Sequence, residues 1–168
     1  MNSTIAAPAA SGASTRALRF ILLGGLIAAT CDITYAVVYS AWRGVPPMRI
    51  LQSVASGLLG KPAFDGGVAT AALGLFLHYA ICIVAAAVYW QAARRMAWLT
   101  VRAVPAGLAF GLAVYGFMNY VVLPLSAFPF PLHPAALTMV TGILVHMFGV
   151  GLPIALCTRA GFRGRDSS

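Results

Sequence analysis

Apolar residues in this chain are gathered into four long runs that are separated by shorter, more polar segments. The runs cover about residues 17–42, 68–92, 103–123 and 134–157. Each run has roughly 20 residues or more, the length that an α-helix needs to cross a hydrocarbon core about 30 Å thick. The pattern predicts an all-α integral membrane protein, with residues 16–158 forming a transmembrane four-helix bundle.

The segment from Pro47 to Gly60, between the first two runs, has a different pattern. A helix would place its polar residues on one face and its apolar residues on the other, as in a short amphipathic helix at a membrane surface. We expect it to cap the bundle or to act as a lipid-sensing or gating element. Its predicted water-facing side comprises Arg49, Gln52, Ser53, Ser56 and Gly60, and its predicted membrane-facing side comprises Ile50, Leu51, Val54, Leu58 and Leu59.

The two ends of the chain differ from the apolar runs. Residues 1–15 are mostly small and lack a hydrophobic period, which predicts a disordered tail. The first run resembles a secretion signal at its basic start, but it continues well beyond signal length and predicts an uncleaved span. Residues 159–168 are predicted to be a basic tail. Pro153 predicts a kink in the fourth span, and His133 is predicted to be solvated in a proline-rich loop.

Composition supports a membrane protein and argues against a nucleic-acid-binding one. The chain is 61% apolar and 8% charged, whereas soluble domains have about 25% charged residues. The net charge of +8 comes from eleven Lys and Arg against three Asp. The basic residues lie at the ends of the apolar runs, where they contact lipid headgroups. The predicted partner is therefore the lipid bilayer.

The distribution of Lys and Arg predicts the orientation, because basic residues are enriched on the cytoplasmic side of membrane proteins. With the N-terminus inside, the cytoplasmic segments hold eight basic residues and the outer segments three, which places both termini in the cytoplasm. The unequal count also argues against dual topology. The eight are Arg16, Arg19, Arg94, Arg95, Arg102, Arg159, Arg163 and Arg165, and the three are Arg43, Arg49 and Lys61.

The stretch Leu51–Gly60, with the sequence LQSVASGLLG, resembles part of the small bacterial inner-membrane proteins that cross the membrane four times. The resemblance extends to the general layout of the chain. It implies a multi-pass protein of the bacterial cell membrane. Because it includes no diagnostic catalytic motif, it implies no site residues.

Each predicted span contains one strongly polar side chain: Asp32, His78, Asn119 or His146. A charge at the bilayer centre costs about 2.5–3.5 kcal/mol on insertion scales, so an intramembrane aspartate is a functional candidate. Counting 1.5 Å per residue from the span ends places Asp32 and both histidines in one layer. Small residues share their stripes, which predicts that these faces point into the bundle.

Three interpretations of this intramembrane polar cluster are open from the sequence. The side chains could bond to one another and to backbone carbonyls and so fix the helix arrangement. They could instead form a proton or ion path, since Asp and His relay protons in membranes. A metal site is the least favoured interpretation, and its candidate ligands are His78, Cys82, His146 and Asp32. No cofactor is expected.

The sequence leaves the activity open. The simplest prediction is an accessory or structural membrane component, and the alternative is a proton-coupled or small-solute transporter that uses the Asp/His cluster. No nucleophile–base pair, phosphate-binding loop or His-Glu-x-x-His motif stands out, so we expect no enzymatic activity. The motif Gly107-x-x-x-Gly111 would serve a homodimer, another membrane partner or packing within the chain. Gly74–His78 and Gly142–His146 also parallel each other, as a repeated helical hairpin would.

Overall fold

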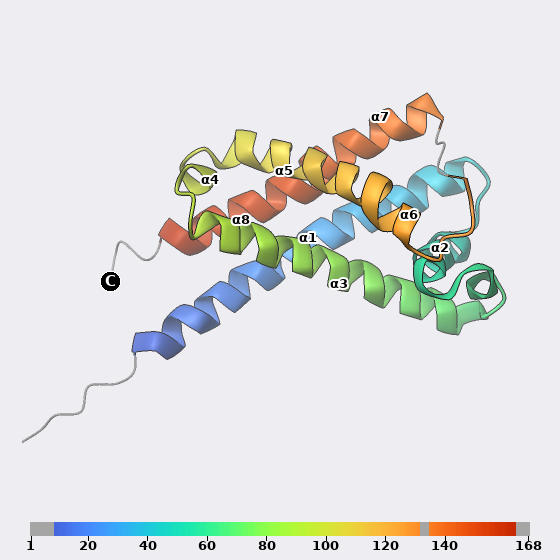
Figure 1. Ribbon diagram of the computed structural model, residues 1–168, viewed down its shortest axis with the longest axis horizontal. Helices are drawn as coiled ribbons and strands as arrows, with labels where there is room; N and C mark the ends of the chain where they lie inside the picture. Colours follow the sequence, from blue (N-terminus) through green and yellow to red (C-terminus); the bar gives the residue numbers. More distant parts are fainter. Residues whose placement is uncertain (1–8, 132–134, 164–168) are drawn as a thin grey trace, which may run out of the picture.

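The computed structural model describes residues 9–131 and 135–163, with side chains from Ser14 onward, and this part of the chain is helical without strands. Four of its helices are long and apolar enough to cross a membrane. They run side by side (Figure 1), which confirms the predicted all-α bundle. Their bounds are Ser14–Trp42, Gly67–Ala93, Ala103–Leu125 and Ala136–Arg163.

The bundle has two distinct ends, which we name after the short helices found there (Figure 1). At the α4 end, α1 (Ala9–Trp42) begins, α8 (Leu152–Arg163) ends, and α4 (Trp98–Val101) joins the second and third spans. At the α2 end, α2 (Pro47–Leu59) and the 3₁₀ turn η1 (Lys61–Phe64) precede α3 (Gly67–Ala93). A loop at residues 126–131 lies at this same end.

The observed start of α1 differs from the predicted one. The helix begins at Ala9, inside the segment that the sequence predicts to be a disordered tail. Alanine is the best helix former, and residues 9–15 include three alanines, so the span continues backwards as a helix. Residues 1–8 and 164–168 lie outside the described residues, as do His133 and the predicted start of the fourth span at Pro134.

The third and fourth spans each contain a π-helical turn shortly before a proline. The third consists of α5 (Ala103–Phe117), η2 (Met118–Val122) and α6 (Leu123–Leu125), and Pro124 follows η2. The fourth consists of α7 (Ala136–Val145), η3 (His146–Gly151) and α8, and Pro153 follows η3. Proline lacks a backbone N–H and clashes with the carbonyl four residues earlier, so a wider turn relieves that position. The predicted irregularity at Pro153 is therefore a π-helical turn.

Glycines set the closest helix contacts. A Cβ on Gly25 of α1 would lie 2.7 Å from the Cα of Ile83 in α3. A Cβ on Gly107 or Gly111 of α5 would meet the backbone of η3 and α8 in the same way. Small residues at such contacts let helix backbones approach closely. The GxxxG motif of the third span is thus used for packing within the chain.

The amphipathic segment is helical, as predicted, but the orientation predicted for it is wrong. Gln52 and Ser56 were expected to face water, yet they are only 2% and 0% exposed, respectively. The Gln52 amide donates a hydrogen bond to the Gly67 carbonyl over 3.1 Å, and Gly74 of α3 lets the backbone of α2 approach at Leu51. This face can pack against α3 because its polar atoms are satisfied: Gln52 donates to α3, and the Ser56 hydroxyl donates to the Ser53 carbonyl of its own helix.

The buried core lies toward the α4 end. It is built largely from alanines, with Tyr89 as its largest fully buried side chain. The Tyr89 hydroxyl donates to the Leu99 carbonyl over 3.0 Å, and its ring packs edge-to-face on Phe110. The core residues are Ala28, Ala86, Tyr89, Ala93, Leu99, Ala103, Ala106, Val150, Ile154 and Ala155. Asp32, His78 and His146 lie next to this core on the side toward the α2 end.

Candidate functional site

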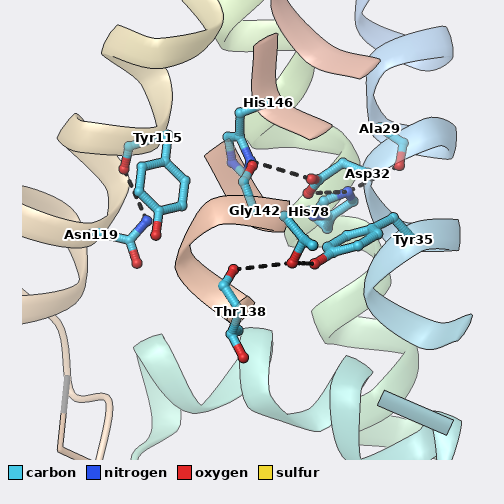
Figure 2. Close-up of polar contacts among 10 residues, drawn as sticks. Ala29, Asp32, Tyr35, His78, Tyr115, Asn119, Thr138, Gly142 and His146 are labelled. Carbon is cyan, nitrogen blue, oxygen red and sulfur yellow. Dashed lines mark hydrogen bonds and ion pairs between the residues drawn. The ribbon is translucent and has the colours of Figure 1, made fainter. Parts of the chain in front are cut away.

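Three polar side chains from three different spans meet inside the bundle. The Asp32 carboxylate of α1 lies between two imidazoles, with Oδ2 3.9 Å from His78 Nε2 and Oδ1 3.6 Å from His146 Nδ1. Figure 2 shows the carboxylate between the two rings. The side chains are 12–18% exposed. The structure thus brings together the three polar residues that the sequence places in one layer.

Each histidine also contacts a backbone carbonyl. His78 Nε2 lies 3.1 Å from the Ala29 carbonyl oxygen of α1, and His146 Nδ1 lies 2.9 Å from the Gly142 carbonyl oxygen one turn earlier in its own span. A carbonyl oxygen can only accept, so both of these ring nitrogens carry a proton. The contact from His78 ties α3 to α1, and both contacts fix the ring orientations beside Asp32.

Local backbone features position the two histidines. His146 is the first residue of the π-helical turn η3, and such turns occur often at functional sites. Its ring packs edge-to-face on the Tyr115 ring of α5, with the centroids 5.3 Å apart. Gly142, one turn before it, leaves room for the same tyrosine ring. On the other side, the small residues Ala28 and Ala29 of α1 are fully buried, which lets α3 bring His78 close to Asp32.

A cavity of about 450 Å³ opens beside the cluster. Asp32, His78 and His146 line it, together with apolar side chains of α3, α5 and η2 and part of α2. A pocket of 300–1,000 Å³ with mainly apolar walls and a few convergent polar groups is typical of small-molecule sites. The cavity therefore has the size and the lining of a binding site for a small molecule.

The α2 end of the cavity is covered. Ser53, Val54 and Gly57 of α2 line that side, and Phe128 lines it from the loop after the third span. The Ala127 amide donates to the Gly57 carbonyl over 2.9 Å, which fastens this loop to α2. The rings of Phe64 in η1 and Phe130 in the loop also pack edge-to-face, with centroids 5.4 Å apart. The amphipathic helix and this loop together form a cover over the cavity.

A line of hydroxyl groups lies between α1 and α7 on the side of the cluster that faces the α2 end, and Figure 2 shows its Tyr35 hydroxyl near the cluster. Tyr35 donates a hydrogen bond to Thr141, and the Tyr39 hydroxyl lies 3.0 Å from the Thr138 hydroxyl. The Arg43 guanidinium also donates to Thr138, over 3.2 Å. Our sequence reasoning missed this line. Its signal was a spacing of three or four residues between polar positions of the first span, which places them on one helical face.

Asn119 lies apart from the cluster. Its side-chain amide donates to the Tyr115 carbonyl over 2.9 Å, one turn earlier in the same span. Figure 2 shows it on the far side of Tyr115 from Asp32, and it does not line the cavity. The π-helical turn that begins at Met118 rotates this stretch of the span. The grouping of Asn119 with Asp32, as the sequence suggested, is not what the structure has.

The metal interpretation gains no support from the geometry. Cys82 lines the same cavity as Asp32, His78 and His146. Within residues 9–131 and 135–163, however, no group of three or more His, Cys, Asp or Glu side chains is arranged so that it could hold a metal ion. The cluster is better described as a carboxylate flanked by two imidazoles at the polar end of an apolar cavity.

Comparisons with protein-family models, with curated proteins and with solved structures found no match for this chain.

Proposed function

We propose that this chain is a membrane transport protein that moves protons, or a small solute together with protons, through the Asp32 cavity. The observation that carries the proposal is the cavity itself, which reaches an intramembrane carboxylate and two histidines. Asp and His are the side chains that relay protons in pumps and transporters. A cluster with a purely structural role needs no open space beside it.

The surroundings of the cluster support the same function. On one side, the Tyr39–Thr138 and Tyr35–Thr141 hydroxyl pairs lie between Arg43 and Asp32, and bridging waters would join them into a path for protons from the α2 end. On the other side, the alanine-rich core is tightly packed. A transporter must close one side of its site while the other is open, and here the α4 side is closed by the packed core while the α2 side is covered only by α2 and the loop that follows the third span. Four helices provide few walls, so the expected partner is a second copy of the chain.

A structural or accessory role is the second candidate. The observation that favours it is the bonding of His78 to the Ala29 carbonyl of a neighbouring helix, which ties α3 to α1. In this role the cluster fixes which helices lie side by side. The two candidates differ in what happens when the cavity is filled without changing the cluster.

Filling the cavity tests the proposal directly. Ala85 of α3 lines it and carries no polar group, so Ala85→Phe should occupy the space and leave Asp32 and its partners in place. The expected result is at least a tenfold fall in the rate at which an acid pulse acidifies proteoliposomes that contain a pH-sensitive dye. Ala72→Phe is the matched control, because Ala72 is exposed on the same helix and outside the cavity.

Two results would count against transport. One is an Ala85→Phe protein that folds and acidifies the vesicles at the wild-type rate. The other is a wild-type protein that acidifies them no faster than protein-free vesicles. Either result would leave the structural role as the better account of the cluster.

The proposed orientation places both termini in the cytoplasm of a bacterial cell and the α2 end outside. It rests on the eight basic residues of the proposed inner segments against three in the outer ones. Reporter fusions after residue 97 and at the C-terminus should therefore report cytoplasm, and fusions near residues 55 and 128 should report the outside. A C-terminal reporter that is active only outside the cell would reverse this orientation.

A further inference from the structure

We propose that the cavity binds a lipophilic ammonium ion, and that this cation enters sideways from the bilayer between α3 and α5. The inference rests on the proposed transport function and specifies its substrate class. It is carried by the hydrogen-bonding partners of the cluster, by the charge of the cavity and by an apolar groove that shares a wall with the cavity.

The neutral form of each histidine in the cluster leaves one ring nitrogen as an acceptor. His78 Nε2 and His146 Nδ1 carry the protons that point at backbone carbonyls. In a neutral imidazole the other ring nitrogen is an acceptor. Neither His78 Nδ1 nor His146 Nε2 has a hydrogen-bond partner among the described residues. Neither atom is fully buried, so a ligand can reach both. Together with the carboxylate, these nitrogens suit a ligand that supplies N–H donors.

The charge of the site favours a cation. Among the described residues, the lining of the cavity contains one carboxylate, that of Asp32, and no Lys or Arg. With neutral imidazoles the site therefore carries one negative charge. Within the membrane, where the dielectric constant is low, a carboxylate whose only partners are neutral imidazoles gains most from a cation that hydrogen-bonds to it directly. An ammonium group meets both needs.

The entry route is an apolar groove between α3 and α5. The groove has a volume of about 580 Å³, and all of its lining side chains are apolar. It lies beside the cavity and is separated from it only by side chains that line both spaces, which are Leu77, Ile81, Ala85, Val114, Met118 and Val122. Val84 and Phe117 on its rim are 61% and 58% exposed, where lipid would lie. The apolar body of the ligand fits this groove while its ammonium reaches Asp32.

Because the α2 end of the cavity is covered, we expect the ligand to enter from the bilayer between α3 and α5. The loop after the third span is fastened to α2 by the hydrogen bond between Ala127 and Gly57, and the ring contact of Phe64 with Phe130 lies over the same end. A hydrophilic solute would have to pass this cover. A lipophilic one can leave the bilayer directly through the groove, which fixes the ligand class as amphipathic.

Three probes with the same ring system and different heads test the ligand class. They are 1-naphthylmethylammonium, the neutral 1-naphthylmethanol and the anionic 1-naphthylacetate. We expect saturable binding of the ammonium probe alone to the full chain in lipid nanodiscs, measured by equilibrium dialysis. Asp32→Asn should weaken that binding at least tenfold, whereas Asp65→Asn, at an exposed aspartate outside the cavity, should not. Equal binding of the alcohol or the acetate, or unchanged binding by Asp32→Asn, would overturn the proposal.

A second pair of variants tests the route. Ala113 lines the groove but not the cavity, so Ala113→Phe should slow the association of the ammonium probe at least fivefold. Val104 lies about two and a half turns earlier on the opposite face of the same helix and is 47% exposed, so Val104→Phe should bind at the wild-type rate. Wild-type association in Ala113→Phe would overturn the sideways route.

Binding should also weaken as the pH falls, because protons compete with the cation for the site. The titratable groups that face Asp32 are His78 and Cys82 from α3 and His146 from η3, with Tyr115 of α5 packed on His146. Protonation of Asp32 or of either imidazole makes the site less negative, so each protonation weakens the binding of the cation. Affinity that rises on acidification would overturn the proposal.

The transport proposal and the ligand proposal fail in different ways. If protons enter vesicles that contain the wild-type protein but the ammonium probe does not bind, the transport proposal stands and the proposed ligand class is wrong. If the probe binds through Asp32 but neither protons nor the probe cross the vesicle membrane, the site stands and transport is wrong.

Discussion

Replacement of Gly111 by alanine is expected to destabilise the folded bundle by about 1–3 kcal/mol, the usual cost of overpacking a close contact. A Cβ at this position would overlap the carbonyl oxygen of His146 and lie 2.6 Å from the Cα of Met147. These are backbone atoms, so no rotamer change can relieve the clash. The whole of η3 would have to move away from α5.

Gly116 provides a matched control on the same span. A Cβ there meets nothing within 4 Å, so Gly116→Ala adds the same methyl group without a clash. Glycine in a helix costs roughly 0.5–1 kcal/mol relative to alanine, so this substitution should stabilise slightly. Unfolding of both variants in mixed micelles with increasing SDS would measure the two effects. Equal stability of the two variants would contradict the close packing of α5 on η3.

The Gly111 variant also connects packing with the site. His146 is both the residue that the added methyl would displace and one of the two partners of Asp32. A Gly111→Ala protein that still folds should therefore have an altered Asp32 cluster. We expect its acid-pulse rate to fall, while Gly116→Ala keeps the wild-type rate, since Gly116 does not line the cavity.

Much of the fold could be predicted because the bilayer demands long apolar helices. The four spans were found within a few residues of their observed bounds, apart from the earlier start of α1 at Ala9 and the later end of the fourth span at Arg163. The orientation of α2 could not be predicted in this way. The sequence pattern of its polar face is the same whether that face contacts water or the backbone of α3. In the structure, Gln52 on this face donates to the Gly67 carbonyl of α3. Only tertiary packing distinguishes the two environments.

The depth of the site along the spans could be predicted from the sequence, but not every residue of the site could. Counting residues along straight helices places Asp32, His78 and His146 in one layer, and the structure brings them together. Asn119, which the sequence included as a candidate member of the cluster, lies outside it and donates to the Tyr115 carbonyl of its own span. The cavity was also beyond reach, because it depends on the separation of α3 from α5, which no pattern within a single helix encodes.

Substitution of Asp32 by asparagine should remove the function while keeping the fold. The nearest ring nitrogens are 3.6 and 3.9 Å from the carboxylate, beyond the usual length of a strong hydrogen bond. Each histidine also keeps its backbone carbonyl partner when the carboxylate is lost. We therefore expect both Asp32→Asn and Asp32→Leu to change the free energy of unfolding by no more than about 1 kcal/mol, the net worth of a typical hydrogen bond.

Both variants should nevertheless lose the proton flux. Asn and Leu cannot take up a proton, and Asp32 is the one acidic side chain within the described spans, so the acid-pulse rate should fall to that of protein-free vesicles. Asp65→Asn makes the same chemical change at an exposed position outside the cavity and should retain the wild-type rate. A folded Asp32→Asn protein with wild-type flux would exclude a proton path through this carboxylate. An Asp32→Leu protein that unfolds while Asp32→Asn stays folded and active would instead assign the cluster a structural role, since only the isosteric amide can replace the carboxylate in holding the helices together.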